Sequence, residues 1–227
     1  QMYTGRLGGG HEDMMISQTE WAISNRVSRN IAYVTQLGDI SNNGDSPSYI
    51  QQWYRATNAM YRLEDPARTQ LGDGIAYGVA VGNHEITPIG QAAIGTTSNY
   101  NRFFGVSHFS GREYYAGHYG TNNNNHFDFF SAGGLDFLVL YFEYNTNPPP
   151  ELLAWADEVL ATNAHRRAIA VTHNFGNTQT PVVWSAQARA IYDALKGHTN
   201  LFLFLGGHVT GQGWREDTYN GHTIRTL

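Results

Sequence analysis

The chain has 227 residues, of which 41% are hydrophobic and 13% aromatic, and this is enough for one packed globular domain. The formal net charge is −5, with no basic run and no stretch of 18 consecutive apolar residues, so the sequence contains neither a nucleic-acid patch nor a membrane span. Cysteine is absent, which excludes disulfides, thiolate metal sites and a cysteine nucleophile. Any metal must therefore be held by His, Asp, Glu, Asn or Gln.

Strand-like and helix-like segments alternate along the chain. Hydrophobic spacing and helix-end signals predict, in chain order, helix 17–29, strand 31–37, helix 49–64, strands 75–81 and 136–142, helix 151–162, strand 167–173, helix 185–196 and strand 201–207. Prolines before 151 suit a helix start, while Ser185 and Gly197 suit the two ends of the helix at 185–196. This alternation predicts an α/β fold with largely parallel central strands.

The segment 88–134 differs from the rest of the chain. It is rich in Gly, Asn, Tyr and Phe, includes "TNNNNHFDFFSAGG", and predicts long loops with an antiparallel hairpin. We interpret it as a loop-rich insertion or rim that borders a site. Its aromatic residues and His118 and His126 suit either stacking on a ligand or packing in the core.

Polar residues follow four of the five predicted strands. Asp39 follows the first, Asn83, His84 and Glu85 follow the second in "YGVAVGNHEITP", and the last two strands end at His173 and His208. Because ligands bind outside the carboxyl ends of strands in α/β sheets, we expect these residues to converge. Glycines at 38, 82, 206 and 207 allow sharp turns there.

The expected cluster has the composition of a metal site. Asp39, Asn83, His173 and His208 offer carboxylate, amide and imidazole ligands, which suit a divalent transition metal such as Mn, Zn or Fe. His84 would then be free for acid–base chemistry. Glu85 is expected to support the ligands without binding the metal itself.

The motifs "LGDIS", "VGNHE", "VTHN" and "GGHVTG", in this order, resemble those of the calcineurin-like metallophosphoesterase superfamily. The resemblance extends from Gln1 to about residue 211. It implies a fold of two mixed β-sheets packed face to face with helices on the outside, a four-layer sandwich. It also implies that Asp39 bridges two metals and that Asn83, His173 and His208 complete the second site. Asn83 and His84 would contact the substrate phosphate, with His84 protonating the leaving oxygen.

The first metal site of the family is only partly represented. Its opening Asp does not occur before Gln1, and "QMYTG" resembles a variant opening, Asp-Thr-Gln, in which Gln1 would replace the usual His ligand. Thr210 stands where the family has its last His. We therefore expect one complete metal site and a weaker second one.

The resemblance implies a metal-dependent hydrolase of phosphoester bonds, with a small-molecule phosphoester as its substrate. In this reaction a hydroxide held on metal attacks phosphorus, and His84 acts as the general acid. Two alternatives stay open. One is a catalytically weakened phosphoesterase scaffold that binds ligands within a larger exported protein, and the other is a fold that a single cation merely stabilises.

We interpret the chain as one domain, 1–227, truncated at both ends, with additional domains outside it. Thirteen Arg against one Lys, and many Asn, Gly, Ser and Thr, are compatible with a periplasmic or extracellular protein.

Overall fold

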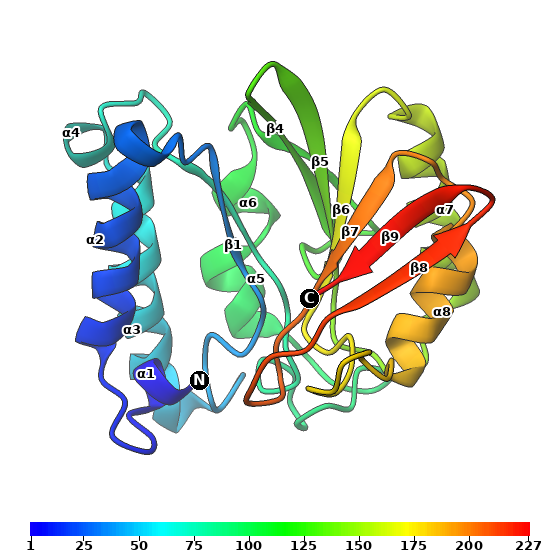
Figure 1. Ribbon diagram of the computed structural model, residues 1–227. Coiled ribbons are helices and arrows are strands. Elements are labelled where there is room, and N and C mark those ends of the chain that lie inside the picture. The colour runs from blue at the N-terminus through cyan, green and yellow to red at the C-terminus, as the bar shows by residue number, and fades with distance from the viewer.

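The computed structural model describes residues 1–227 and contains two β-sheets between two layers of helices (Figure 1). The strands are β1 (Tyr33–Gln36), β2 (Ala76–Val79), β3 (Tyr115–His118), β4 (His126–Ala132), β5 (Leu135–Phe142), β6 (Arg167–Thr172), β7 (Leu201–Leu205), β8 (Arg215–Tyr219) and β9 (His222–Thr226). The helices are α1 (Met2–Gly5), α2 (Glu12–Arg29), α3 (Ile50–Met60), α4 (Pro66–Thr69), α5 (Ser98–Phe104), α6 (Val106–Phe109), α7 (Pro150–Thr162) and α8 (Ala186–Leu195). None of the helices combines the length and the apolar character needed to cross a bilayer.

The two sheets differ in size and direction. The larger has seven strands in the order β3-β4-β5-β6-β7-β9-β8 and is mixed, because β5, β6, β7 and β9 are parallel neighbours while the outer pairs are antiparallel. The smaller consists of β1 and β2 alone, and these pair in parallel. The predicted α/β class with two packed sheets is confirmed, with the smaller sheet parallel rather than mixed.

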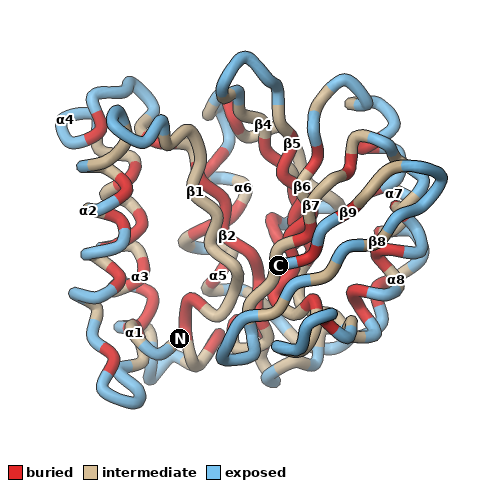
Figure 2. The backbone as a smooth tube through the Cα atoms, in the orientation of Figure 1, coloured by how far each residue is buried: buried red, intermediate tan, exposed pale blue.

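Three groups of buried side chains hold the layers together. The first group lies between the small sheet and the helices α2 and α3 on its outside. The second group lies between the large sheet and the helices α7 and α8 on its outside. The third lies between the sheets and joins Ala80, which follows β2, to Val139, Tyr141 and Val171 of β5 and β6. Figure 2 shows the buried residues concentrated along the strands and on the helix sides that face them. Face-to-face packing of the sheets therefore places the carboxyl ends of β1, β2, β5, β6 and β7 at one end of the molecule.

The five predicted strands are all present, and the predicted helices are confirmed with shifted ends. Helix α2 begins at Glu12, earlier than residue 17, and ends where Asn30 adopts a left-handed conformation with φ 53°. The segment 49–64 forms α3 followed by a 3₁₀ turn at Tyr61–Glu64. Helix α7 has Pro150 at its first position, and the Ser185 hydroxyl caps α8 by accepting a hydrogen bond from the Ala188 N–H at 3.1 Å.

The segment 88–134 has more regular structure than the predicted loop-rich rim. It forms the helices α5 and α6 and the strands β3 and β4, which pair as the predicted antiparallel hairpin. Tyr100 and Phe104 of α5 are fully buried in the core against the small sheet. His126 is buried too, and its ring stacks on Tyr141 at 4.4 Å between centroids. Core packing, rather than ligand stacking, accounts for His126.

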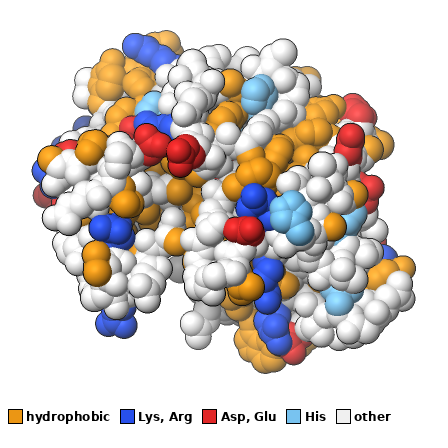
Figure 3. Space-filling model, turned by 90° about the horizontal axis from the view of Figure 1, so that it is seen from above, with side chains coloured by type: hydrophobic (Ala, Val, Ile, Leu, Met, Phe, Trp, Pro, Cys, Tyr) orange, Lys and Arg blue, Asp and Glu red, His pale blue; other side chains and the backbone are white.

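The end of the molecule seen in Figure 3 is the one with the amino ends of β1 and β6. Acidic and basic side chains alternate on this face without forming one basic patch, and hydrophobic side chains gather between its two halves. An apolar cavity of about 330 Å³ opens between the sheets near Tyr33, Phe130 and Ile169. The polar residues singled out in the sequence lie at the opposite end.

Candidate metal centre

Three of the predicted ligands meet at the carboxyl ends of β1, β6 and β7, in the lower part of Figure 1. One ligand atom from each of Asp39, His173 and His208 lies within 4.8 Å of the others. The Asp39 Oδ2 to His173 Nε2 distance is 3.0 Å, and the His208 Nδ1 to His173 Nε2 distance is 3.2 Å. Residues far apart in the sequence are thus brought into contact by the packing of the two sheets.

The backbone at these ligands adopts uncommon conformations. Asp39 has φ 56° and His208 has φ 69°, in the left-handed region that residues other than glycine seldom enter. Gly38, before Asp39, has φ 94°, and a Cβ there would lie 2.6 Å from the His173 Nδ1. Such conformations cost of order 1–3 kcal/mol each and cluster at functional sites. Their occurrence at two converging side chains supports a functional role for the cluster.

Hydrogen bonds fix which nitrogen of His173 faces the cluster. Its Nδ1 donates to the Leu37 carbonyl at 2.7 Å, which leaves Nε2 as the nitrogen that points to Asp39. Burial acts against charge on both partners, but the contact with His173 lowers the pKa of Asp39, and Asp39 raises the pKa of His173. Burial and the neighbouring His173 lower the pKa of His208, which favours the neutral imidazole that a metal requires.

Asn83 and Gln1 each contribute a buried oxygen without a protein partner. The Asn83 Oδ1 accepts no hydrogen bond, although its neighbour His84 donates its backbone N–H to Asp39 Oδ1 at 3.0 Å. The Gln1 Oε1 is buried and unpaired as well, and the Gln1 backbone nitrogen contacts the Asp39 carbonyl. Buried polar atoms normally have partners. The two unpaired oxygens leave Asn83 and Gln1 available as cation ligands, and the ligand roles predicted for them stay predictions.

The donor set fits a divalent transition metal. One carboxylate and two imidazoles converge, and amide oxygens lie unpaired in the same region. Mn, Zn and Fe accept this mixture of oxygen and nitrogen ligands. Thr210, by contrast, lies exposed on the loop after His208.

Glu85 ties the loops after β1 and β2 together. Its Oε2 accepts the backbone N–H of Asp39 and of Gly82, both at 2.8 Å, while its Oε1 accepts the N–H and the hydroxyl of Ser41. The side chain is fully buried, and burial together with the charge of Asp39 raises its pKa. Glu85 thus fixes the backbone of Asp39, and its predicted role as support of metal ligands stays a prediction.

His84 is held at one ring nitrogen only. Its Nδ1 donates to the Asn42 carbonyl at 2.9 Å, which leaves Nε2 without a protein partner. The residue is half-buried and lies next to Asn83. An imidazole fixed in this way can donate or accept a proton at Nε2.

Tyr144 is the residue at this site that the sequence prediction missed. Its ring lies 5.8 Å from the His208 ring and 6.3 Å from the His173 ring, between centroids. The residue follows β5, the one predicted strand to which no polar residue had been assigned. The signal was present in "FEYN", since Glu143, Tyr144 and Asn145 follow β5 at the same edge of the sheet as the candidate ligands.

No family model matches the sequence. The chain is similar to Uncharacterized protein YvnB of Bacillus subtilis (strain 168), with 30% identity over 194 residues that cover 84% of this chain and 13% of YvnB. The chain thus spans a small part of that relative. The fold is also similar to a solved structure described as "GAP50 the anchor in the inner membrane complex of Plasmodium". The TM-score is 0.47 and the sequence identity 12%, and the match covers 93% of this chain and 66% of that one.

Proposed function

We infer that this protein is a metal-dependent phosphoester hydrolase. The observation that carries this proposal is the convergence of Asp39, His173 and His208 at the strand ends, next to an imidazole that is held at Nδ1 alone. Metal ligands accompanied by a free acid–base group suit hydrolysis better than structural metal binding, which has no use for the extra imidazole.

Each residue has a distinct role in the proposed reaction. Asp39, His173, His208 and Asn83 would hold a divalent metal, which supplies Lewis acidity by lowering the pKa of water and neutralising phosphoryl charge. Gln1, whose Oε1 is buried and unpaired, would be a ligand for a second cation. These residues belong to both sheets, so the packing of the whole domain sets their spacing.

His84 would act on the leaving group. Its Nδ1–H is committed to the Asn42 carbonyl, so the proton that it gives to the leaving oxygen must come from Nε2. The backbone N–H of His84 also donates to Asp39 Oδ1 at 3.0 Å, which fixes the position of the imidazole relative to the cluster. General acid catalysis by a positioned side chain contributes roughly 10²–10⁴-fold to the rate.

Substitution of His84 tests the proposal. We expect the protein loaded with Mn, Zn or Fe to bind at least one metal per chain and to hydrolyse a chromogenic phosphomonoester or phosphodiester. His84→Asn should lower kcat by about a hundredfold or more with unchanged metal content, since the ring accounts for general acid catalysis. His165→Asn, at an exposed position away from the cluster, is the matched control. Metal content well below one per chain, or equal turnover of the two variants, would overturn the proposal.

The same experiment decides the second candidate function, a ligand-binding module on a weakened scaffold. The observation that favours it is the exposed Thr210 at the position where the resembled family has its last His ligand. One bound metal per chain without turnover on either substrate would support this candidate.

A further inference from the structure

Tyr144 lies among the residues of the candidate metal centre but has no role in the proposed metal binding or proton transfer. Its ring centroid lies 5.8 Å from that of His208 and 6.3 Å from that of His173, both of which follow strands of the large sheet. The ring also approaches the turn after β2, since a Cβ built on Gly90 would lie 3.5 Å from Tyr144 Cε1 and 3.7 Å from the Asn83 Cβ. The ring is therefore bordered by candidate ligands from both sheets.

The hydroxyl group of Tyr144 has no partner within the protein. The residue is half-buried, and the hydrogen bond that it does form runs from its backbone N–H to the Val81 carbonyl at 2.8 Å. Cε1, the atom that approaches Gly90, is bonded to the carbon that carries the hydroxyl, so the hydroxyl-bearing half of the ring lies beside this turn. A phenol hydroxyl can donate and accept a hydrogen bond, and this one is available to a ligand.

Gln187 holds the backbone on both sides of Tyr144. This buried residue belongs to α8, and its Nε2 donates to the Glu143 carbonyl at 2.6 Å. Its Oε1 accepts the Asn145 backbone N–H at 3.1 Å, while the Glu143 N–H donates to the Asn125 Oδ1 at 3.0 Å. The backbone N–H groups of three consecutive residues therefore all have partners. The backbone that carries the ring is thus fixed before any ligand binds, as a preorganised site requires.

The cluster itself offers few positively charged groups to a phosphate. The charged groups that shift the pKa of His208 are His173, Asp39 and His84, with no Lys or Arg among them. Arg and Lys are the usual side-chain partners of phosphate in proteins. Since neither acts on His208, a phosphoryl group beside it depends on the proposed metal and on neutral donors, and the Tyr144 hydroxyl is such a donor.

We propose that the Tyr144 hydroxyl donates a hydrogen bond to a phosphoryl oxygen of the substrate and that Gln187 positions this hydroxyl. The proposal rests on the phosphoesterase function inferred above, and it adds a phosphate-binding residue to Asn83 and His84. It follows from the place of the ring between candidate ligands of the two sheets, the unpaired hydroxyl and the fixed backbone on either side.

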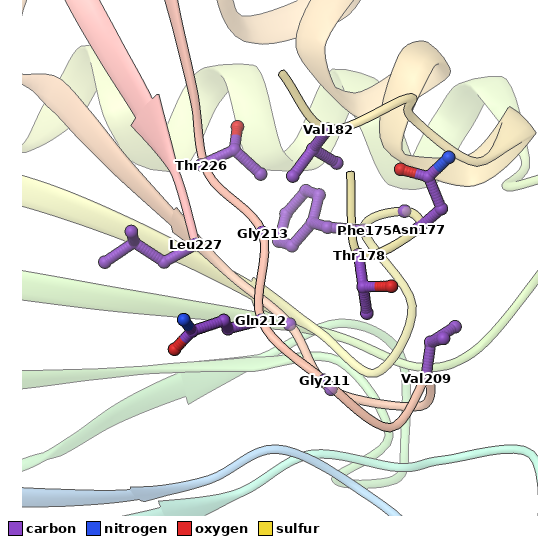
Figure 4. Close-up of a pocket in the computed structure, with 13 residues that line it drawn as sticks. Phe175, Asn177, Thr178, Val182, Val209, Gly211, Gln212, Gly213, Thr226 and Leu227 are labelled. Carbon is purple, nitrogen blue, oxygen red and sulfur yellow. The ribbon is translucent and has the colours of Figure 1, made fainter. Parts of the chain in front are cut away.

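The cavity in Figure 4 lies along the loops after β6 and β7, which also follow the two histidines of the cluster. It has a volume of about 240 Å³, and its lining includes neither Tyr144 nor any of Asp39, His173 and His208. None of its residues is therefore assigned a contact with the phosphoryl group.

Tyr144→Phe tests the hydroxyl, because it removes this group and keeps the ring. In the protein loaded with Mn or Zn, we expect the variant to bind inorganic phosphate at least about tenfold more weakly with unchanged metal content, since a hydrogen bond to a charged group is lost. Titration calorimetry measures the phosphate affinity independently of turnover. Tyr219→Phe, at an exposed position on the outer strand β8, is the matched control and should bind phosphate as the unaltered protein does.

Gln187→Met tests the positioning role, because a side chain of similar length replaces both hydrogen bonds to the backbone with none. Phosphate binding should weaken toward the level of Tyr144→Phe. The double variant with Tyr144→Phe should lose little more, since residues that act through one contact are not additive. Additive losses would show that Gln187 acts independently of the Tyr144 hydroxyl and would overturn its positioning role.

The possible outcomes separate the role of Tyr144 from the hydrolase function. Equal phosphate affinity of Tyr144→Phe and Tyr219→Phe would overturn the role of the hydroxyl, and so would a loss of metal from Tyr144→Phe. If esters are hydrolysed and Tyr144→Phe changes neither KM nor phosphate affinity, the hydrolase function stands and the role of Tyr144 fails. If phosphate binding weakens as expected but the unaltered protein hydrolyses no ester, Tyr144 binds phosphate and the hydrolase function fails.

Discussion

Asp39 uses its two carboxylate oxygens differently. Oδ1 accepts the backbone N–H of His84 at 3.0 Å, while Oδ2 faces His173 Nε2 at 3.0 Å. Its own backbone N–H is anchored on Glu85. One oxygen therefore fixes the side chain and the other is directed into the cluster, which is the arrangement that a preorganised ligand needs.

Asp128 is a buried carboxyl group of a different kind. It lies between the two sheets, where the Tyr33 hydroxyl bonds to its Oδ2 and its Oδ1 has no partner. Burial raises its pKa well above the ordinary 3.8. No cationic side chain offsets the burial, so the folded protein favours the neutral form of Asp128.

Replacing Asp128 by Asn should make the free energy of unfolding fall less as the pH rises. Because the folded pKa lies above the unfolded one, the stability from the neutral acid is complete below pH 3.8 and is lost as pH rises towards the folded pKa. The unaltered protein loses up to about 1.4 kcal/mol of stability per pH unit in this range. The Asn variant does not lose this stability, because an amide does not ionise. The free energy of unfolding of Asp128→Asn relative to the unaltered protein should therefore increase from pH 4 to pH 8, by about 1 kcal/mol or more.

Urea unfolding at several pH values measures this difference. Asp136→Asn, at an exposed position on the neighbouring strand β5, controls for the change from Asp to Asn. A difference for Asp128→Asn that stays constant from pH 4 to pH 8 would mean that Asp128 is ionised in the folded protein.

At the scale of the elements, the turns that follow β1 and β2 determine the site. These turns pack so closely that a Cβ on Gly82 would lie 2.3 Å from the Asp39 Oδ1 and 2.4 Å from the Asp39 backbone nitrogen. Glu85 accepts hydrogen bonds from both turns. The two strands of the small sheet thus present Asp39 and Asn83 as one unit.

Gly82→Ala should weaken metal binding by at least about tenfold, which corresponds to about 1.4 kcal/mol. The added methyl group displaces Asp39, whose backbone cannot yield without breaking its bond to Glu85. Titration calorimetry with Mn or Zn measures the affinity. Gly72→Ala, where an added Cβ meets no atom within 4 Å, should bind metal as the unaltered protein does. Equal affinity of the two variants would show that the Gly82 contact does not position the ligands.

At the scale of the whole molecule, the cluster joins the two sheets. Asp39 belongs to the small sheet, while His173 and His208 belong to the large one. The remaining contact between the sheets includes the chain of hydroxyl groups of Tyr33, Tyr141 and Thr35. A cation at the cluster would add a link between the two halves of the fold.

Metal should therefore stabilise the folded protein. A ligand that binds only the folded state at one hundred times its Kd adds about 2.7 kcal/mol, which for a chain of this size raises the Tm by roughly 5–10 °C. Differential scanning calorimetry with and without Mn or Zn measures the shift. His208→Asn should abolish it, and His165→Asn should retain it. A Tm that no divalent metal changes would contradict the assigned ligands.

The sequence alone determined the elements and most of the candidate ligands. Apolar runs that end in a polar residue, with a glycine before three of them, singled out Asp39, Asn83, His173 and His208, because a strand and the turn after it depend on residues close together in the chain. The same local patterns identified the helices α2, α3, α7 and α8 and the cap at Ser185, but not α5 and α6. The sequence also singled out His84 and Glu85, whereas their hydrogen bonds to Asn42, Asp39 and Ser41 come from the packing of two turns.

Only the tertiary structure decided which of the strand ends lie next to one another. The division into sheets of two and seven strands, the burial of α5 in the core and the position of Tyr144 all depend on contacts between distant residues. No sequence pattern encodes such contacts directly, since a side chain at a strand end has the same local signature whether or not another strand end faces it. The physical reason is that the packing of the two sheets, rather than any single strand, sets the distances between Asp39, His173 and His208.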